Sequence, residues 1–147
     1  MRRFWTLVLT PVLALAFFLA GSPAANAFGS EVLGCAWNGG SWVANNCGSS
    51  TGNLAFSPHN LSGSYSYSWT VTYGASTVTT PCASGIEPCI LSGCTATSSS
   101  CTVYADNPYP LTNRVITARL QLTQSGQSRT ITASGTAYSS KPACPLC

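Results

Sequence analysis

Side chains able to do acid–base or metal chemistry are few in this chain of 147 residues. It contains three acidic residues, Glu31, Glu87 and Asp106, and a single histidine, His59. The acids lie in separate regions of the sequence, and no serine stands in the G-x-S-x-G turn that exposes a hydrolase nucleophile. His59, flanked by Pro and Asn, is expected to be a solvated turn residue. Without paired carboxylates or a catalytic triad, we expect a non-enzymatic protein with no cofactor and no bound metal.

The eight cysteines carry a clearer chemical signal. An even number of cysteines predicts a disulfide framework in an exported chain, although the sequence alone leaves many pairings open. Their grouping favours short local bridges, of which the simplest set is Cys35–Cys47, Cys82–Cys89, Cys94–Cys101 and Cys144–Cys147. The last pair also has the C-x2-C spacing of zinc ligands, but no second such pair accompanies it, and a structural bridge is favoured.

Residues 35–47 are the best candidate for a binding surface. Trp37 and Trp42 lie in a Gly- and Asn-rich stretch that the flanking cysteines would close. Exposed aromatic rings edged by amide side chains can stack on sugar rings or anchor a protein contact. The alternative is that the rings cover the hydrophobic core, and we expect a split, with one ring buried and the other partly exposed. The candidate ligand-binding residues are Trp37, Asn38, Trp42 and Asn45.

The first 27 residues predict export. Arg2 and Arg3 precede an almost wholly apolar stretch from Phe4 to Ala20, and an A-x-A motif follows at residues 25–27. This order is typical of a cleavable signal peptide, so the mature chain is expected to begin at Phe28. The expected location is secreted or extracellular, with no membrane segment after cleavage.

Removal of the signal leaves a nearly uncharged chain. Arg114, Arg119, Arg129 and Lys141 remain against the three acidic residues, which gives a net charge of +1. Such a chain has no electrostatic footprint for nucleic acid or for an anionic membrane surface. The expected partner is an extracellular protein or a polysaccharide, and the expected state is a monomer.

Polar–apolar alternation predicts an all-β domain. In residues 65–73 every odd position is aromatic or apolar and every even position is Ser or Thr, the pattern of a strand with one buried face. Residues 115–123 and 128–138 alternate likewise around Gly126, which predicts an antiparallel hairpin. Shorter strands are expected at 53–57, 76–80 and 101–105.

Trp69 is expected on the buried face, packed against the small residues Ala133, Gly135 and Ala137. The stretch from 54 to 138 resembles the immunoglobulin-like sandwiches of bacterial surface proteins, especially the polycystic-kidney-disease (PKD) type. Tyr67-Ser68-Trp69 is similar to the aromatic–x–Trp core of that family's third strand, and the final hairpin is similar to its closing hairpin. The family often has an acidic, Gly-rich turn after this tryptophan, which residues 70–74 lack, so the resemblance implies no metal or ligand role there.

The expected organisation is a signal peptide at 1–27, a cysteine-closed loop region at 28–52, a single Ig-like antiparallel β-sandwich at 53–140 and a CxxC tail at 141–147. The expected function is a secreted, non-enzymatic binding or adhesion module. Two alternatives stay open. One is a small carbohydrate-binding protein that uses Trp37 and Trp42, and the other is a disulfide-rich inhibitor that presents the 82–101 loop to a secreted enzyme.

Mass spectrometry of the protein from culture medium tests the export and disulfide expectations together. The mature chain should begin at Phe28, and alkylation without reduction should label none of its cysteines, because all of them are expected to be bridged. A retained signal would contradict export, and labelled thiols at Cys144 and Cys147 would contradict the C-terminal bridge.

Overall fold

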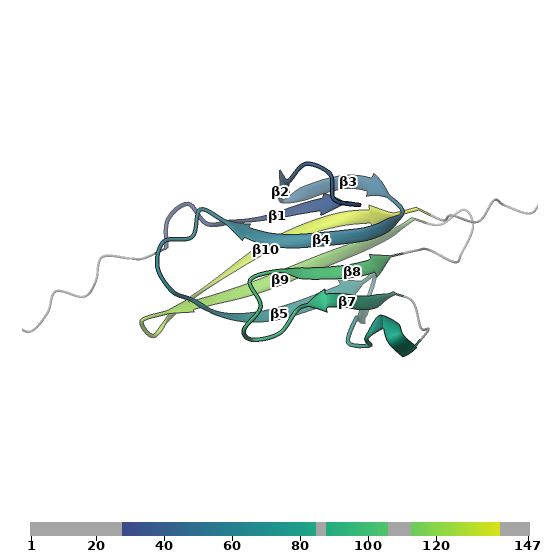
Figure 1. Ribbon diagram of the computed structural model, residues 1–147. Coiled ribbons are helices and arrows are strands. Elements are labelled where there is room, and N and C mark those ends of the chain that lie inside the picture. The colour runs from purple at the N-terminus through teal and green to yellow at the C-terminus, as the bar shows by residue number, and fades with distance from the viewer. Residues whose placement is uncertain (1–27, 85–87, 106–112, 139–147) are drawn as a thin grey trace, which may run out of the picture.

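Two five-stranded sheets packed face to face form the domain (Figure 1). The computed structural model describes residues 28–84, 88–105 and 113–138. The predicted all-β sandwich with disulfides is confirmed. The signal peptide, the 141–147 tail with Cys144 and Cys147, and the acids Glu87 and Asp106 lie outside the described residues. In the described ranges, no helix is long and apolar enough to cross a membrane.

The first sheet has the strand order β2-β1-β4-β8-β7, and the second has the order β3-β10-β9-β5-β6. The first contains β1 (Val32–Trp37), β2 (Val43–Ala44), β4 (Gly52–His59), β7 (Cys89–Gly93) and β8 (Cys101–Ala105). The second contains β3 (Asn46–Ser50), β5 (Ser66–Tyr73), β6 (Ser76–Thr77), β9 (Arg114–Gln124) and β10 (Gln127–Ala137). A short 3-10 turn, η1 (Cys82–Ser84), precedes β7. The named strands pair antiparallel, except that β3 runs parallel to β10.

The predicted hairpin is confirmed in β9 and β10. The two strands pair from Gln127↔Gln124 to Ala137↔Arg114, and Ser125 and Gly126 turn the chain with φ angles of 51° and 79°. Glycine adopts this left-handed conformation without a steric cost, which suits it to the tight turn. β5 then pairs with β9 in the same sheet, so the three strands with the clearest alternation lie side by side.

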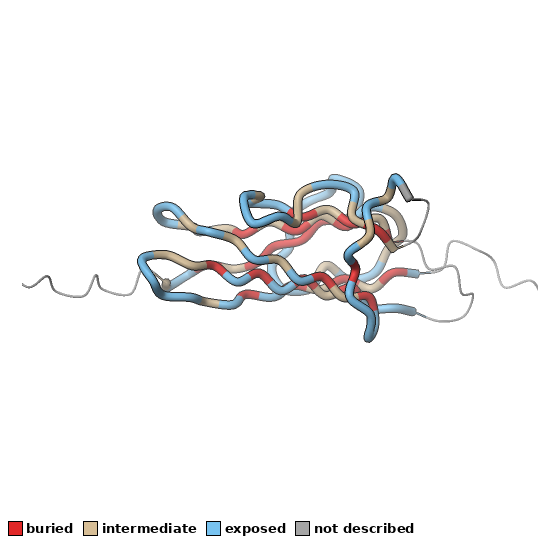
Figure 2. Tube along the Cα trace, turned by 90° about the horizontal axis from the view of Figure 1, so that it is seen from below, coloured by how far each residue is buried: buried red, intermediate tan, exposed pale blue. Residues whose placement is uncertain are grey.

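The core lies between the inner faces of the two sheets (Figure 2). Its fully buried large side chains come from both layers, and they include Leu33, Leu54, Phe56, Val103, Ile116, Leu120 and Leu122. Burying one such side chain stabilises a fold by roughly 1.5–3 kcal/mol. The alternation of inward and outward residues in β5, β9 and β10 follows from this packing.

The expectation of a loop region at 28–52 is corrected by the structure. This segment holds β1, β2 and β3, and β1 pairs along its whole length with β4, from Val32↔His59 to Trp37↔Leu54. Residues 33–36 are buried on both faces of the strand, so β1 is small or apolar throughout and shows no alternation. The sandwich therefore begins at Val32 and not at residue 53.

The bulky neighbour of the small β10 residues is Trp37 and not Trp69. A Cβ atom added at Gly135 would lie 2.9 Å from Leu54 Cδ2 and 3.0 Å from Trp37 Cζ2. β9 separates β5 from β10, which keeps Trp69 away from this position. Trp69 is instead half-buried, and its indole N–H donates to the carbonyl of Ser98 at 2.8 Å.

Substitution of Gly135 by alanine tests this close approach. Because the new methyl group would press on Leu54 and Trp37, Gly135→Ala should lower the free energy of unfolding by about 1–3 kcal/mol, measured by urea denaturation. Gly29→Ala is the matched control, since a methyl group there meets nothing within 4 Å. Equal stability of the two variants would contradict the packing of Trp37 under β10.

Candidate functional site

Three of the predicted disulfides are confirmed. Cys35–Cys47, Cys82–Cys89 and Cys94–Cys101 are all formed, with Cα–Cα distances of 5.8, 4.8 and 4.3 Å. The last two are local, and they hold η1 to β7 and close the turn between β7 and β8. The first has a different role, because β1 belongs to the first sheet and β3 to the second. It is a covalent link between the two layers, and the loop that it closes carries Trp42.

Asn45 marks the point where the chain passes from one sheet to the other. β2 ends at Ala44 in the first sheet and β3 begins at Asn46 in the second. Asn45 has a φ of 67°, a left-handed conformation that asparagine tolerates better than most residues. Its N–H donates to the carbonyl of Leu33 at 3.1 Å, and its carbonyl accepts from the N–H of Ser134 at 2.8 Å. The backbone of Asn45 thus contacts both layers.

Asn38 serves the turn after β1. Its φ is 50°, its side-chain amide donates to the carbonyl of Thr51 at 2.8 Å, and its side-chain oxygen accepts from the N–H of Asn53 at 2.8 Å. Both ends of the side chain are therefore engaged within the protein. The structure gives Asn38 and Asn45 structural contacts, and the pocket lined by Trp42 and His59 includes neither of them in its lining.

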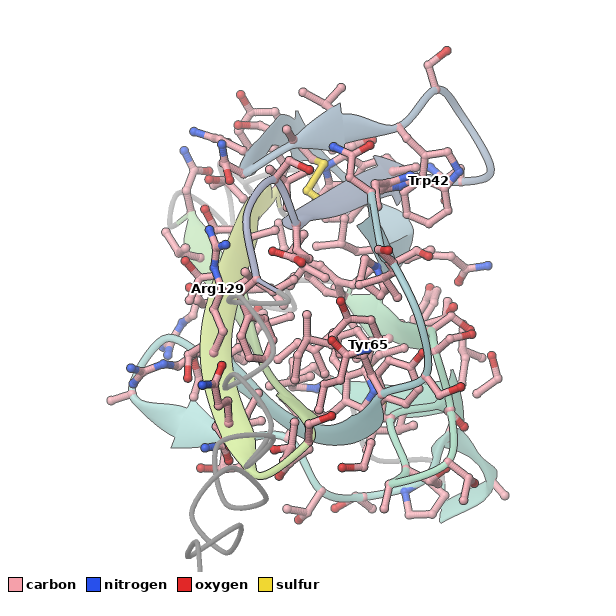
Figure 3. All side chains as sticks on the ribbon, turned by 90° about the vertical axis from the view of Figure 1, so that its left-hand side faces the viewer. Trp42, Tyr65 and Arg129 are labelled. Carbon is pink, nitrogen blue, oxygen red and sulfur yellow. A yellow bond between two sulfur atoms is a disulfide. The ribbon has the colours of Figure 1, made fainter. Side chains whose placement is uncertain are left out.

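The expected split between the two tryptophans is found. Trp37 is half-buried against the core, and its indole N–H is buried without a hydrogen-bond partner among the described residues. Trp42 is 46% exposed. Figure 3, which views the domain from one end, shows Trp42 at the rim of the molecule. The two rings do not form one continuous platform, since one packs inward and the other outward.

His59 supports the exposed tryptophan. The ring centroids of Trp42 and His59 lie 5.3 Å apart in an edge-on arrangement. The imidazole also covers Gly34, where an added Cβ would lie 2.7 Å from His59 Cδ2. His59 is the half-buried last residue of β4, so the expectation of a solvated turn residue is wrong. The imidazole therefore occupies space that a side chain at position 34 would need.

A shallow pocket lies around these two rings. Val43 beside it is 48% exposed. We call this surface the Trp42–His59 patch, and its lining residues are Val32, Gly34, Trp42, Val43, Ala44 and His59. Apart from the imidazole the lining side chains are aromatic or aliphatic, so the patch suits an apolar contact. Trp42 stands out in the sequence by its type, but nothing local predicts its contact with His59, because His59 ends β4 whereas Trp42 directly precedes β2.

A buried carboxylate lies directly before β1, next to the position where Val32 pairs with His59. Glu31 is 3% exposed, and its carboxylate accepts from Arg129 Nη1 at 2.8 Å and from the N–H of Gly29 at 2.8 Å. The Tyr65 hydroxyl donates to it at 3.3 Å, and the Tyr65 ring lies 6.0 Å from that of Phe28. Together these contacts fasten the segment before β1 to β10.

The environment of Glu31 sets its protonation. Burial alone would raise the pKa of this carboxyl, but hydrogen bonds from the N–H groups of Glu31 and Gly29 lower it. The charge of Arg129 and the hydroxyl of Tyr65 lower it further, and the resulting pKa lies below the usual value. Glu31 is therefore a structural anion in the folded domain.

Among the described residues, no group of three or more His, Cys, Asp or Glu side chains is placed to hold a metal ion. No known protein family, curated protein or solved structure matches this chain. The described residues form a disulfide-linked, two-sheet β domain that carries the Trp42–His59 patch on its surface.

Replacement of Glu31 by glutamine tests whether the contacts of the Glu31 carboxylate stabilise the fold. Because the folded pKa is lowered, the stability from the carboxylate is complete above the unfolded pKa of about 4.3 and is lost as the pH falls through the folded value. Glu31→Gln should lower stability at neutral pH by about 1–3 kcal/mol and flatten the loss on acidification. Urea denaturation at several pH values measures both, with Arg119→Gln as a surface-charge control. If the free energy of unfolding depends on pH in the same way for wild type and Glu31→Gln, the stabilising role of the Glu31 carboxylate is excluded.

Proposed function

We propose that the mature domain is a secreted, non-enzymatic binding or adhesion module of immunoglobulin-like type that contacts its partner through the Trp42–His59 patch. The observation that carries the proposal is the 46% exposure of Trp42, a ring held on a sheet surface and not in the core. Tryptophan is among the residues that most often dominate protein interfaces, and its exposure on a folded domain favours a contact role.

The order of the strands supports the immunoglobulin-like part of the proposal. Taken in order across the first sheet, β1, β4, β8 and β7 correspond to strands A, B, E and D of a constant-type sandwich. β5, β9 and β10 occupy the places of strands C, F and G in the facing sheet. On this assignment Trp69 lies on strand C, where such domains carry a tryptophan.

The rigid mounting of Trp42 supports a binding role. The ring lies within the loop closed by Cys35–Cys47, and the chain is fixed again at Asn45 by hydrogen bonds to both sheets. The His59 ring packs edge-on against the indole. A side chain that is ordered before binding loses little conformational entropy on binding, which favours affinity.

The chemistry of the patch favours a protein partner over a saccharide at this place. Its lining is mostly aliphatic, whereas sugar recognition needs several free hydrogen-bonding groups beside the stacking ring.

The contacts of the 94–101 loop disfavour the alternative of an enzyme inhibitor. The carbonyls of Ser98 and Ala96 accept hydrogen bonds from Trp69 and from the N–H of Tyr67, which ties this loop down on β5.

The proposal of export combines the disulfides with the predicted signal peptide. Disulfides persist in oxidising compartments, and three of them are formed in the described part of this small domain. An extracellular setting gives an exposed tryptophan access to partners on cell surfaces.

Binding of the labelled mature protein to the washed surface of the producing cells tests the function. Trp42→Ala should reduce binding about tenfold or more while the melting temperature changes little, because the lost ring is largely solvent-facing. Leu91→Ala is the matched control, since Leu91 is 44% exposed on the remote edge strand β7. Retained binding in Trp42→Ala, or equal loss in both variants, would refute the assigned surface.

A further inference from the structure

The outer face of the second sheet is made almost wholly of hydroxyl groups. Every outward position from 66 to 72 on β5 and from 128 to 136 on β10 is Ser or Thr. The outward positions of β9 between them hold Val115, Thr117, Arg119, Gln121 and Thr123, and Val115, at the end of the strand, is 48% exposed. We call this surface the hydroxyl face. It belongs to the sheet opposite the Trp42–His59 patch, so the two surfaces look away from each other.

Arg119 lies at the centre of this face. In the strand register, Thr70 and Thr132 flank Arg119 on either side, and Ser68 and Thr130 flank Gln121 in the next row. Neighbouring strands in a sheet lie about 4.8 Å apart, so these side chains form closely spaced rows. Five of them line one shallow depression: Ser68, Thr70, Arg119, Gln121 and Thr130.

The polar groups of the depression have no partners in the described part of the chain. Among the described residues, Glu31 forms its ion pair with Arg129. The guanidinium of Arg119 is exposed and contacts no carboxylate or carbonyl of these residues. The outward positions of β5, β9 and β10 carry no acidic residue. The depression therefore combines one uncompensated cation with three hydroxyls and an amide that are free to bond outward.

We propose that the hydroxyl face binds an acidic polysaccharide, with Arg119 receiving its carboxylate or sulfate groups. The planar guanidinium fork matches the two oxygens of such a group, and charge-assisted bonds of this kind are the strongest that a surface offers. The Ser and Thr rows beside it both donate and accept, which matches the hydroxyls of neighbouring sugar units. The extended arrangement over three strands fits a polymer, and the absence of apolar side chains from the lining of the depression disfavours a protein partner there.

Affinity electrophoresis of the mature protein tests the proposal. The gels contain polygalacturonate, dextran sulfate or neutral dextran, and single-stranded DNA serves as a polyanion without sugar acids. At least one acidic polysaccharide should retard the protein, and which one does so distinguishes carboxylate from sulfate. Neutral dextran and DNA should retard it little.

Three variants connect the retardation to the face. Arg119→Gln should weaken the association constant about tenfold or more, because it removes the charge-assisted bond. Arg114→Gln removes the same charge from the end of the same strand, where Arg114 lies over the Tyr73 ring at 5.7 Å, and should leave binding within about twofold. Thr130→Val keeps the shape and removes one hydroxyl, and should weaken binding by a smaller factor.

Several results would overturn the inference. These are no retardation by either acidic polysaccharide, equal retardation by DNA, or equal losses in Arg119→Gln and Arg114→Gln. Inorganic sulfate that competes fully at micromolar concentration would also overturn it, because it would indicate a small-anion site. Trp42→Ala should bind polysaccharide like wild type. Arg119→Gln therefore tests the polysaccharide site, whereas Trp42→Ala tests the proposed function, and failure of one proposal can be distinguished from failure of the other.

Discussion

The crossing of the chain from one sheet to the other at Asn45, locked by Cys35–Cys47, is the constraint on which the arrangement of this domain depends. Closing a loop of this length with a disulfide stabilises a fold by about 3 kcal/mol through the entropy of the unfolded chain. Because the bridge joins β1 to β3, it also fixes the distance between the two layers at that edge. Within this part of the chain, Trp37 packs against the core and Trp42 faces solvent.

One core supports two outer surfaces of different chemistry. Successive side chains of a strand point to opposite faces, so the outer residues vary without disturbing the inner ones. The first sheet presents aliphatic residues and the Trp42–His59 pair, whereas the second presents hydroxyls around Arg119. The Glu31–Arg129 contact lies at one end and fastens the beginning of the domain to β10. The two outer faces therefore differ in chemistry although they share one core.

The strands that the sequence predicts well are those with one buried and one solvent-exposed face. β5, β9 and β10 each place Ser, Thr or charged residues outward and apolar residues inward, and their period of two is visible without the fold. β1 was missed because Gly34 and Ala36 are covered on the outer side as well, so its residues show no alternation. The candidate site was predicted only in part, since Trp42 stands out by type but His59 acquires its place from strand pairing.

Local information in the sequence was thus sufficient to predict the all-β class, the final hairpin and three short disulfides. It also predicted that one of the two tryptophans is buried and the other partly exposed. Only the tertiary structure decided which tryptophan turns inward, because that depends on Gly135 of β10 leaving space for Trp37 at the other end of the chain. It likewise decided that Arg129 neutralises Glu31 while Arg119 stays free. The reason is physical: periodicity assigns each residue to a face of its own strand, but the order and register of the strands decide what that face meets.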